Sequence, residues 1–211
     1  MQGFSGPGKG IVIVLFIVTA AVLVPGRHPA FGLDCSARTY GAAQDLSAPN
    51  NYGVQSYIFV KDGSAYDYAA GGHINASLWE GTNNSTSLST WVEIGYSRGW
   101  NGSNILTWYW ADDRPSYGFF EHRITTPSIS AGTWHHLKIL YSGNNTWTVF
   151  IDGSQPNNGG GVSSPNPPDS NSFEAGLEST SECSDLGSSS SPGISDNLQW
   201  RARSERCVTH E

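Results

Sequence analysis

Apolar and polar residues alternate through most of the chain after residue 50, and Gly, Asn, Ser or Pro separates one alternating segment from the next. The alternating segments are rich in aromatic and β-branched residues and recur about every ten residues, which is typical of an all-β sandwich or barrel. No stretch combines helical periodicity with capping residues. The predicted strands are Val54–Val60, His73–Trp79, Thr90–Tyr96, Ile105–Ala111, Phe119–Ile124, Trp134–Tyr141, Trp147–Ile151, Phe173–Glu178 and Ile194–Arg201.

Two connections between the predicted strands are unusually long. Asp152–Ser172 is rich in Gly, Pro, Asn and Ser, and Ser181–Gly193 is rich in Ser. Loops of this length in a compact domain are either functional or disordered. The first connection leads into the strand that carries Glu174, so it is a candidate lid over a site there. A solvated linker is the alternative.

Two of the predicted strands carry a glutamate followed two residues later by a glycine. Residues two apart on a strand share a face. Glu93 and Gly95 therefore lie together, opposite an apolar face, and so do Glu174, Gly176 and Glu178. Because glutamate and glycine are poor strand formers, the pattern predicts a ligand site with room above each carboxylate. The alternative is that these are exposed glutamates on the solvated face of a sheet.

Paired carboxylates can divide the roles of acid and base when their environments separate their pKa values. Glu174 and Glu178 are poor candidates for such a pair, since four residues of strand span about 13 Å. A retaining glycosidase needs its two carboxyl groups about 5–5.5 Å apart. The partner of Glu174 must therefore come from a neighbouring strand, and Glu93 is the natural candidate.

The N-terminus has the layout of a secretory signal peptide. Lys9 precedes a run of 14 mostly apolar residues, Pro25-Gly26 ends the run, and Ala30-Phe31-Gly32 offers a small-x-small cleavage site. The run is short for a membrane span, although an uncleaved signal anchor is the alternative. We therefore expect residues 1–32 to be a signal peptide, residues 33–211 to form one domain, and the protein to be secreted.

The charge of the chain limits the classes of partner that it can bind. The whole chain has 11 basic and 18 acidic residues. The expected signal peptide holds two basic residues and no acidic one, so nine basic and 18 acidic residues remain, a net charge of about −9. An acidic chain without a cluster of Lys or Arg is unsuited to nucleic acid or anionic membranes, so we expect neither as a partner.

Three cysteines remain after the expected cleavage: Cys35, Cys183 and Cys207. An odd number in an exported protein allows one disulfide and one further thiol, and the sequence does not choose among the three pairings. No histidine has metal-ligand spacing with another histidine or a cysteine, so we expect no metal site. His135 and His136 are adjacent on a predicted strand and should point to opposite faces, which indicates structural roles.

Three segments together resemble a known family. WVEIGYSRGW and the following ILTWYWADD resemble the I-E-A-G-W and T-Y-W-T-x-D segments of neprosin-type glutamic peptidases. FEAGLES resembles the V-E-W-G-G-E-V segment of the same family, with Glu174, Gly176 and Glu178 at the matching positions. The resemblance implies an acid-acting endopeptidase without metal or organic cofactor, with Glu93 and Glu174 as the catalytic residues. It also implies cleavage near proline.

A second resemblance concerns AGTWHHLKILYSGNNTWTVFIDG, which is similar to the W-H-H hairpin of laminin-G and other concanavalin-like modules, many of which bind glycans. Both resemblances imply a concanavalin A-like double-sheet jelly roll. The function hypotheses are therefore a glutamic endopeptidase acting on peptides or proteins and, as the alternative, a non-catalytic glycan-binding module.

Two further aromatic residues are candidates for contact with a substrate or a sugar. Trp108 and Trp110 share one face of a predicted strand, with Tyr109 on the other. Such residues can stack on sugar rings or line a peptide groove, although they more often pack between sheets. The predicted substrate-binding residues are Gly95, Gly176, Glu178, Trp108 and Trp110.

Overall fold

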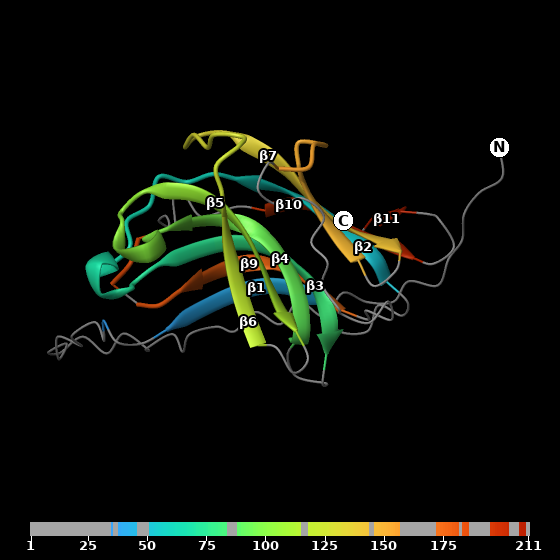
Figure 1. Ribbon diagram of the computed structural model, residues 1–211, viewed down its shortest axis with the longest axis horizontal. Helices are drawn as coiled ribbons and strands as arrows, with labels where there is room; N and C mark the ends of the chain where they lie inside the picture. Colours follow the sequence, from blue (N-terminus) through green and yellow to red (C-terminus); the bar gives the residue numbers. More distant parts are fainter. Residues whose placement is uncertain are drawn as a thin grey trace, which may run out of the picture.

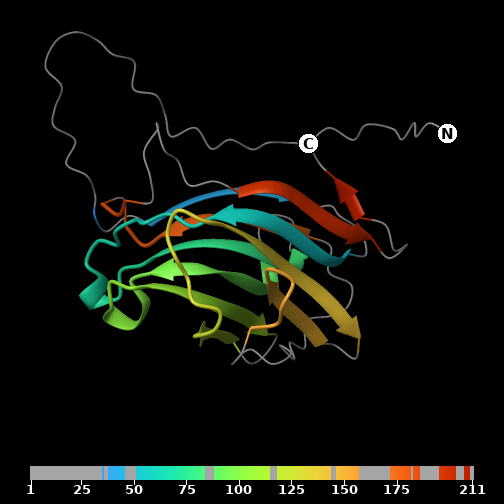
Figure 2. The same ribbon diagram turned by 90° about the horizontal axis from the view of Figure 1, so that it is seen from above.

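Two antiparallel β-sheets pack face to face in the computed structural model, as the alternating pattern predicts (Figure 1). The structure describes residues 35, 38–45, 51–83, 88–114, 118–143, 146–156, 172–181, 183–185, 195–202 and 207–209. Within these residues the fold is a double-sheet jelly-roll sandwich, which confirms the predicted fold class. The views in Figures 1 and 2 show the two sheets as curved layers.

The larger sheet has six strands. In their order across the sheet these are β1 (Thr39–Asp45), β9 (Ser172–Ser179), β3 (Ile74–Asn83), β4 (Leu88–Arg98), β5 (Leu106–Arg114) and β6 (Gly118–Ile124). The second sheet has five: β11 (Cys207–Thr209), β10 (Ser195–Ala202), β2 (Asn51–Phe59), β7 (Trp134–Gly143) and β8 (Thr146–Ile151). Two short 3-10 helices, η1 (Tyr68–Ala70) and η2 (Trp100–Gly102), lie in the connections.

All nine predicted strands are present, but β1 and β11 were not predicted. The β1 segment, TYGAAQD, contains Gly and Ala, which are poor strand formers. It is extended because it pairs along its whole length with β9, from Thr39 opposite Ser179 to Asp45 opposite Phe173. β11 has only three residues, too few to show alternation.

The core lies between the sheets. Strands β2 to β9 contribute core residues, such as Val92, Ile94 and Tyr96 from β4, all fully buried. The largest fully buried side chains of the core are Trp108, Trp147, Tyr96 and Phe173. The opposite face of the six-stranded sheet carries further polar residues, whereas Glu80 and Asp112, which pair with Val92, are buried on the core face.

One disulfide joins Cys35 to Cys183, with the two Cα atoms 5.0 Å apart. The sequence left the pairing open. This bond links the segment before β1 to the segment after β9, the two strands that pair at one end of the six-stranded sheet. It therefore fastens the edge strand β1 to the sheet.

The predicted signal peptide lies outside the described residues, and so do residues 157–171 of the candidate lid and residues 182 and 186–193 of the second long connection. Within the part of the chain that the structure describes, no helix has the length and hydrophobicity to span a membrane.

Candidate functional site

Glu93 and Glu174 lie in one row across the six-stranded sheet. Trp79 on β3 pairs with Glu93 on one side and with Glu174 on the other. Ala111 on β5 continues the row beyond Glu93, and Glu121 on β6 follows it. Since directly paired residues share a face, the three glutamates and Trp79 all lie on the sheet face that points away from the core.

The two predicted catalytic glutamates are two strands apart. At 4.7–4.9 Å per strand, their Cα atoms are separated by roughly 9–10 Å, with Trp79 between them. Glu93 is 4% exposed and Glu174 is 5% exposed. The structure therefore places both residues in one row on one face, each with only a small part of its surface open to solvent.

Glu93 is held by a chain of two hydroxyl groups, the first of which bonds the carboxyl group. Tyr109 on β5 donates a hydrogen bond to Oε1 of Glu93, and the same tyrosine oxygen is hydrogen-bonded to Oγ of Ser77 on β3. Because Tyr109 uses its own hydrogen on the carboxyl group, Ser77 is the donor in the second bond. This chain of Ser77, Tyr109 and Glu93 fixes the orientation of the carboxyl group.

Gly95 makes this arrangement possible. It lies between Tyr109 and Ser77, its pairing partners on the two neighbouring strands. A Cβ atom at Gly95 would lie 2.4 Å from Oγ of Ser77 and 2.4 Å from the carbonyl oxygen of Ala76. The sequence predicted that the glycine leaves room for a ligand. That prediction was wrong for Gly95, because neighbouring protein atoms already fill the space.

The environment of Glu93 favours its neutral form. Burial raises the pKa of Glu93 to about 7, the hydroxyl groups of Tyr109 and Ser77 oppose the rise, and the nearby carboxylates of Glu178 and Glu121 add to it. Burial and the negative charge of Glu93 also raise the pKa of Tyr109 well above its usual value, so Tyr109 stays a hydrogen-bond donor. Glu93 is therefore a carboxylic acid that retains its proton under acidic conditions.

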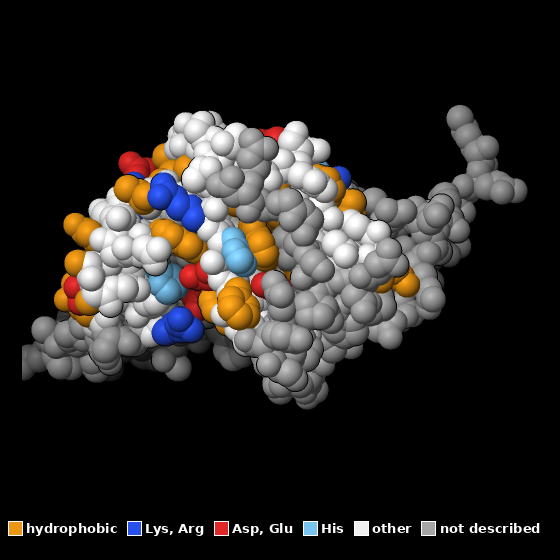
Figure 3. All heavy atoms as spheres, viewed as in Figure 1, with side chains coloured by type: hydrophobic (Ala, Val, Ile, Leu, Met, Phe, Trp, Pro, Cys, Tyr) orange, Lys and Arg blue, Asp and Glu red, His pale blue; other side chains and the backbone are white. Residues whose placement is uncertain are grey.

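The other predicted residues on β9 lie on the same face. Gly176 pairs with Ser77 and with Ala42 of β1, and Glu178 forms an ion pair with Arg38, with Nη1 and Oε1 3.1 Å apart. Figure 3 shows acidic side chains gathered near histidine and hydrophobic side chains in the middle of the visible face.

A hollow of about 400 Å³ adjoins this row. It is lined by Trp100, Asn101, Ser103, Ile105, Glu121, His122 and Arg123. The Trp100 ring lies against Tyr109, with the ring centres 5.7 Å apart. The hollow is thus next to the tyrosine that binds Glu93, and its volume is in the range of small-ligand pockets.

Trp108 and Trp110 do not line the site. Both are core residues, 0% and 6% exposed, and they lie on the opposite face of β5 from Tyr109. Trp108 packs edge-on against Tyr96, and Trp110 stacks on His122. The prediction that these tryptophans contact a substrate was wrong, because alternation along β5 directs them between the sheets.

Sequence reasoning missed Ser77, Trp79 and Tyr109. The signal for Tyr109 was present, since alternation placed it opposite Trp108 and Trp110. Finding its partner required the register of β4 and β5, which puts Tyr109 opposite Gly95. Identifying Trp79 as a site residue required the strand order, because β3 lies between β9 and β4, which are far apart in sequence.

The histidines of β7 do lie on opposite sides of their strand, as predicted. His135 is hydrogen-bonded to Asp152 and to Thr133 and packs against Trp108, whereas His136 stacks on Tyr57. Among the described residues, no group of three or more His, Cys, Asp or Glu side chains is arranged to hold a metal ion.

No protein-family model matches the chain, and no similar sequence was found among curated proteins. Among solved structures, scytalido-glutamic peptidase with a transition state analog inhibitor is similar at 12% identity and a TM-score of 0.47. That match covers 85% of this chain and 81% of the peptidase.

Two other solved structures have different functions. Polysaccharide lyase family 18 aly-SJ02 matches at 14% identity and a TM-score of 0.44, covering 80% of this chain and 79% of the lyase. Sheep galectin-11, in complex with glycerol, matches at 15% identity and a TM-score of 0.40, covering 71% of this chain and 96% of the galectin. At these TM-scores the function has to be argued from the residues of this chain.

Proposed function

We propose that the protein is a glutamic endopeptidase that hydrolyses peptide bonds at acidic pH, with Glu93 as the acid and Glu174 as the base. The observation that carries the proposal is the row Glu93–Trp79–Glu174, in which a buried glutamate with a pKa of about 7 faces the same side as a second buried glutamate. The resemblance of the surrounding segments to neprosin-type peptidases supports peptides as the substrate class.

The hydrogen bond from Tyr109 supports the assignment of Glu93 as the acid. Oε1 of Glu93 accepts this bond, so in the neutral carboxyl group the proton is on Oε2. Oε2 is thereby the atom that can donate a proton to a substrate. A proton donor must carry its proton at the working pH, and the raised pKa of Glu93 keeps this residue protonated under acidic conditions.

In the proposed reaction the water and the peptide bond lie over Trp79, with Glu93 on one side and Glu174 on the other. The carboxylate of Glu174 takes a proton from water as the water oxygen attacks the carbonyl carbon. Oε2 of Glu93 first donates its hydrogen bond to the carbonyl oxygen, which gains negative charge. When the C–N bond breaks, the proton of Glu93 passes to the leaving nitrogen, and Glu93 regains a proton as Glu174 loses one.

Secretion is part of the proposal. The N-terminal segment has the layout of a signal peptide. The disulfide between Cys35 and Cys183 is of the kind that persists in oxidising compartments and is rare in the cytosol. We therefore propose that the domain works outside the cell, on peptides or proteins.

The test is digestion of denatured casein at pH 5 by the wild-type protein and by Glu93→Gln and Glu174→Gln. Either substitution should lower the cleavage rate by at least about 100-fold, the usual contribution of general acid or base catalysis. Asp62→Asn is a suitable control because Asp62 is an exposed acid paired with Arg98, outside the row. A folded wild-type protein that cleaves no peptide bond would overturn the proposal.

The alternative was a glycan-binding module built on Trp108 and Trp110. Both side chains are buried in the core, where a glycan does not reach them. Glycan recognition at the six-stranded sheet has no other observation in its favour.

A further inference from the structure

The row of Glu174, Trp79 and Glu93 limits the direction in which a peptide substrate can lie. Given the proposed function, on which this assignment rests, Glu174 acts on the attacking water and Glu93 acts on the carbonyl oxygen. In an extended peptide the carbonyl groups point across the chain, and water also attacks the carbonyl carbon from the side of the chain. Because the row runs across the strands, a substrate that reacts between the two glutamates lies parallel to the strands.

Two aromatic rings lie one row away from the glutamates. Trp91 is two residues before Glu93 on β4, and Phe119 is two residues before Glu121 on β6. Both aromatic residues pair with Asp113 of β5, so their side chains are on the face that carries the glutamates. We call Trp91 and Phe119 the ring pair.

The ring pair offers an apolar surface to solvent. The two ring centres are 6.1 Å apart. Since Cα atoms two strands apart are separated by roughly 9–10 Å, the rings converge over β5. Phe119 is 50% exposed and Trp91 is partly buried. A large apolar side chain can pack against such a surface.

The position of the ring pair matches the repeat of an extended substrate. Trp91 and Glu93 are separated by about 6.8 Å along β4, the distance between residues two apart on a strand. Side chains on one side of an extended substrate have the same spacing. A substrate with its scissile bond beside Glu93 therefore places the side chain of its first or second residue from that bond over the ring pair.

We propose that the ring pair is a specificity subsite that binds one large apolar side chain of the substrate, such as Phe, Tyr or Leu. This side chain occupies a fixed position within two residues of the cleaved bond. Its apolar surface leaves water when it packs on Trp91 and Phe119, which stabilises the bound substrate. The contact also holds the scissile bond over Trp79, between the acid and the base.

Two carboxyl groups lie beside the ring pair, so a basic side chain is the alternative occupant. Asp113 pairs with both rings, and Glu121 is the second residue after Phe119. Burial raises the pKa of both carboxyl groups, which favours their neutral forms under the acidic conditions at which Glu93 carries its proton. The attraction for a cation is weakened accordingly.

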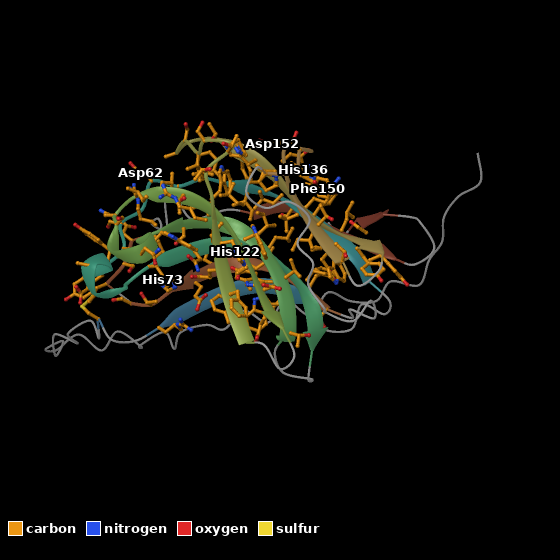
Figure 4. The ribbon with its side chains drawn as sticks, viewed as in Figure 1. Asp62, His73, His122, His136, Phe150 and Asp152 are labelled. Atoms are coloured by element: carbon orange, nitrogen blue, oxygen red, sulfur yellow. A yellow bond between two sulfur atoms is a disulfide. The ribbon has the colours of Figure 1, made fainter. Side chains whose placement is uncertain are left out.

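Positive groups already lie near these carboxyl groups. His73 lowers the pKa of Glu121 through its charge and so opposes the effect of burial. Arg123, the second residue after Glu121 and on the same face of β6, donates a hydrogen bond from Nε to Oγ1 of Thr107. Figure 4 labels His73 and, next to Glu121 in sequence, His122. A basic side chain would meet these groups, whereas an apolar side chain needs only the rings.

Cleavage of Ala-rich peptides by the wild-type protein at pH 5 tests the inference. The peptides carry one Phe, one Lys or neither, and mass spectrometry locates the cleaved bonds. We expect cleavage at one fixed distance from Phe, at most two residues away, with kcat/KM at least about tenfold higher than for the peptide with neither residue. The Lys peptide should behave like the peptide with neither.

Phe119→Ala should bring the kcat/KM values of the Phe peptide and the plain peptide close together, and Phe119→Leu should retain most of the difference. Phe120→Ala is the matched control, because Phe120 is 46% exposed but pairs with Asp112 on the other face of β6. The ratio of two substrates within one variant cancels any general loss of activity, so a purely structural effect would not change it.

Peptide binding separates this inference from the proposed function. In a fluorescence titration, Glu93→Gln should bind the Phe peptide at least about tenfold more tightly than the other two. If the wild type cleaves nothing, the proposed function fails and this binding ratio still decides the inference. Equal binding of the Phe and plain peptides, a preference for Lys, or an equal effect of Phe120→Ala and Phe119→Ala would overturn the subsite.

Discussion

At the scale of single residues, Glu93 is the group on which the chemistry depends. A carboxyl group buried in a sheet face ionises only at a free-energy cost, and the structure offsets part of that cost through Tyr109 and Ser77. The remaining cost keeps the proton on Glu93 up to a pH of about 7. The same property makes Glu93 an acid catalyst and a source of instability at higher pH.

Glu93→Gln should stabilise the protein at alkaline pH. The pKa of Glu93 rises from 4.5 to about 7 on folding, so between these values the native state binds more protons and stability falls as the pH rises. Above pH 7 the penalty is complete, about 3 kcal/mol. Urea denaturation should therefore show equal stability of wild type and variant at pH 4 and a more stable variant at pH 8. Equal stability at both pH values would mean that Glu93 ionises freely in the folded protein.

Tyr109→Phe should shift the pH dependence of activity. The hydrogen bond from Tyr109 lowers the pKa of Glu93, so its loss raises that pKa further. The alkaline limb of the kcat/KM profile should move to higher pH by on the order of one unit, with a lower maximum because the carboxyl group is less well oriented. Tyr66→Phe provides the control. An unshifted limb would contradict a role for Tyr109 in setting the proton affinity of Glu93.

At the scale of the elements, the register of β3, β4 and β9 builds the site. β3 brings Trp79 between the two glutamates and Ser77 within reach of Tyr109. The close approach of β3 and β4 at Gly95 is what lets three side chains from three strands meet. The geometry of the carboxyl group therefore depends on the backbone spacing as well as on the catalytic residues themselves.

Gly95→Ala tests this dependence. The added Cβ would lie 2.4 Å from both the carbonyl oxygen of Ala76 and Oγ of Ser77, so either the strands or Ser77 must move. We expect a loss of about 1–3 kcal/mol in the free energy of unfolding, typical of overpacking, together with reduced cleavage. Thermal melts and casein assays measure both. Wild-type activity and stability in this variant would show that the spacing is not critical.

The sequence predicted the strands well but not their order in the sheets or their register. Alternation identified the core face of β4 and β9 and the outward direction of Glu93 and Glu174, because it is a local property of each strand. Alternation along β5 shows that Trp108 and Trp110 share a face. It does not show which face of β5 is buried, so it could not place the two tryptophans in the core. The sequence did not identify Trp79 and Ser77 as site residues, because the pairing of β3 with β9 joins residues about a hundred positions apart.

At the scale of the whole molecule, the sandwich separates two surfaces. The six-stranded sheet presents the buried glutamates and the hollow beside Tyr109, while the five-stranded sheet presents the exposed rings of Tyr57 and Trp134. The disulfide between Cys35 and Cys183 secures the edge of the first sheet, next to the strand that carries Glu174.

Removing this disulfide should destabilise the whole domain. Cys35 and Cys183 are 148 residues apart in sequence, so the bond strongly restricts the unfolded chain. Cys35→Ser should lower the free energy of unfolding by about 2–5 kcal/mol, as measured by denaturant titration. Cys207→Ser is the control and should match the wild type. A fall of equal size in the control, or none in Cys35→Ser, would contradict the assignment of the stabilising bond to Cys35 and Cys183.

The pH dependence of casein hydrolysis by the wild-type protein tests the central claim most directly. If Glu93 must carry its proton, kcat/KM should be highest under acidic conditions and should fall tenfold per pH unit above a pH of about 7, the pKa of Glu93. Activity that continues to rise through pH 8 would contradict Glu93 as the acid. Hydrolysis that survives unchanged in Glu93→Gln over the same pH range would contradict it equally.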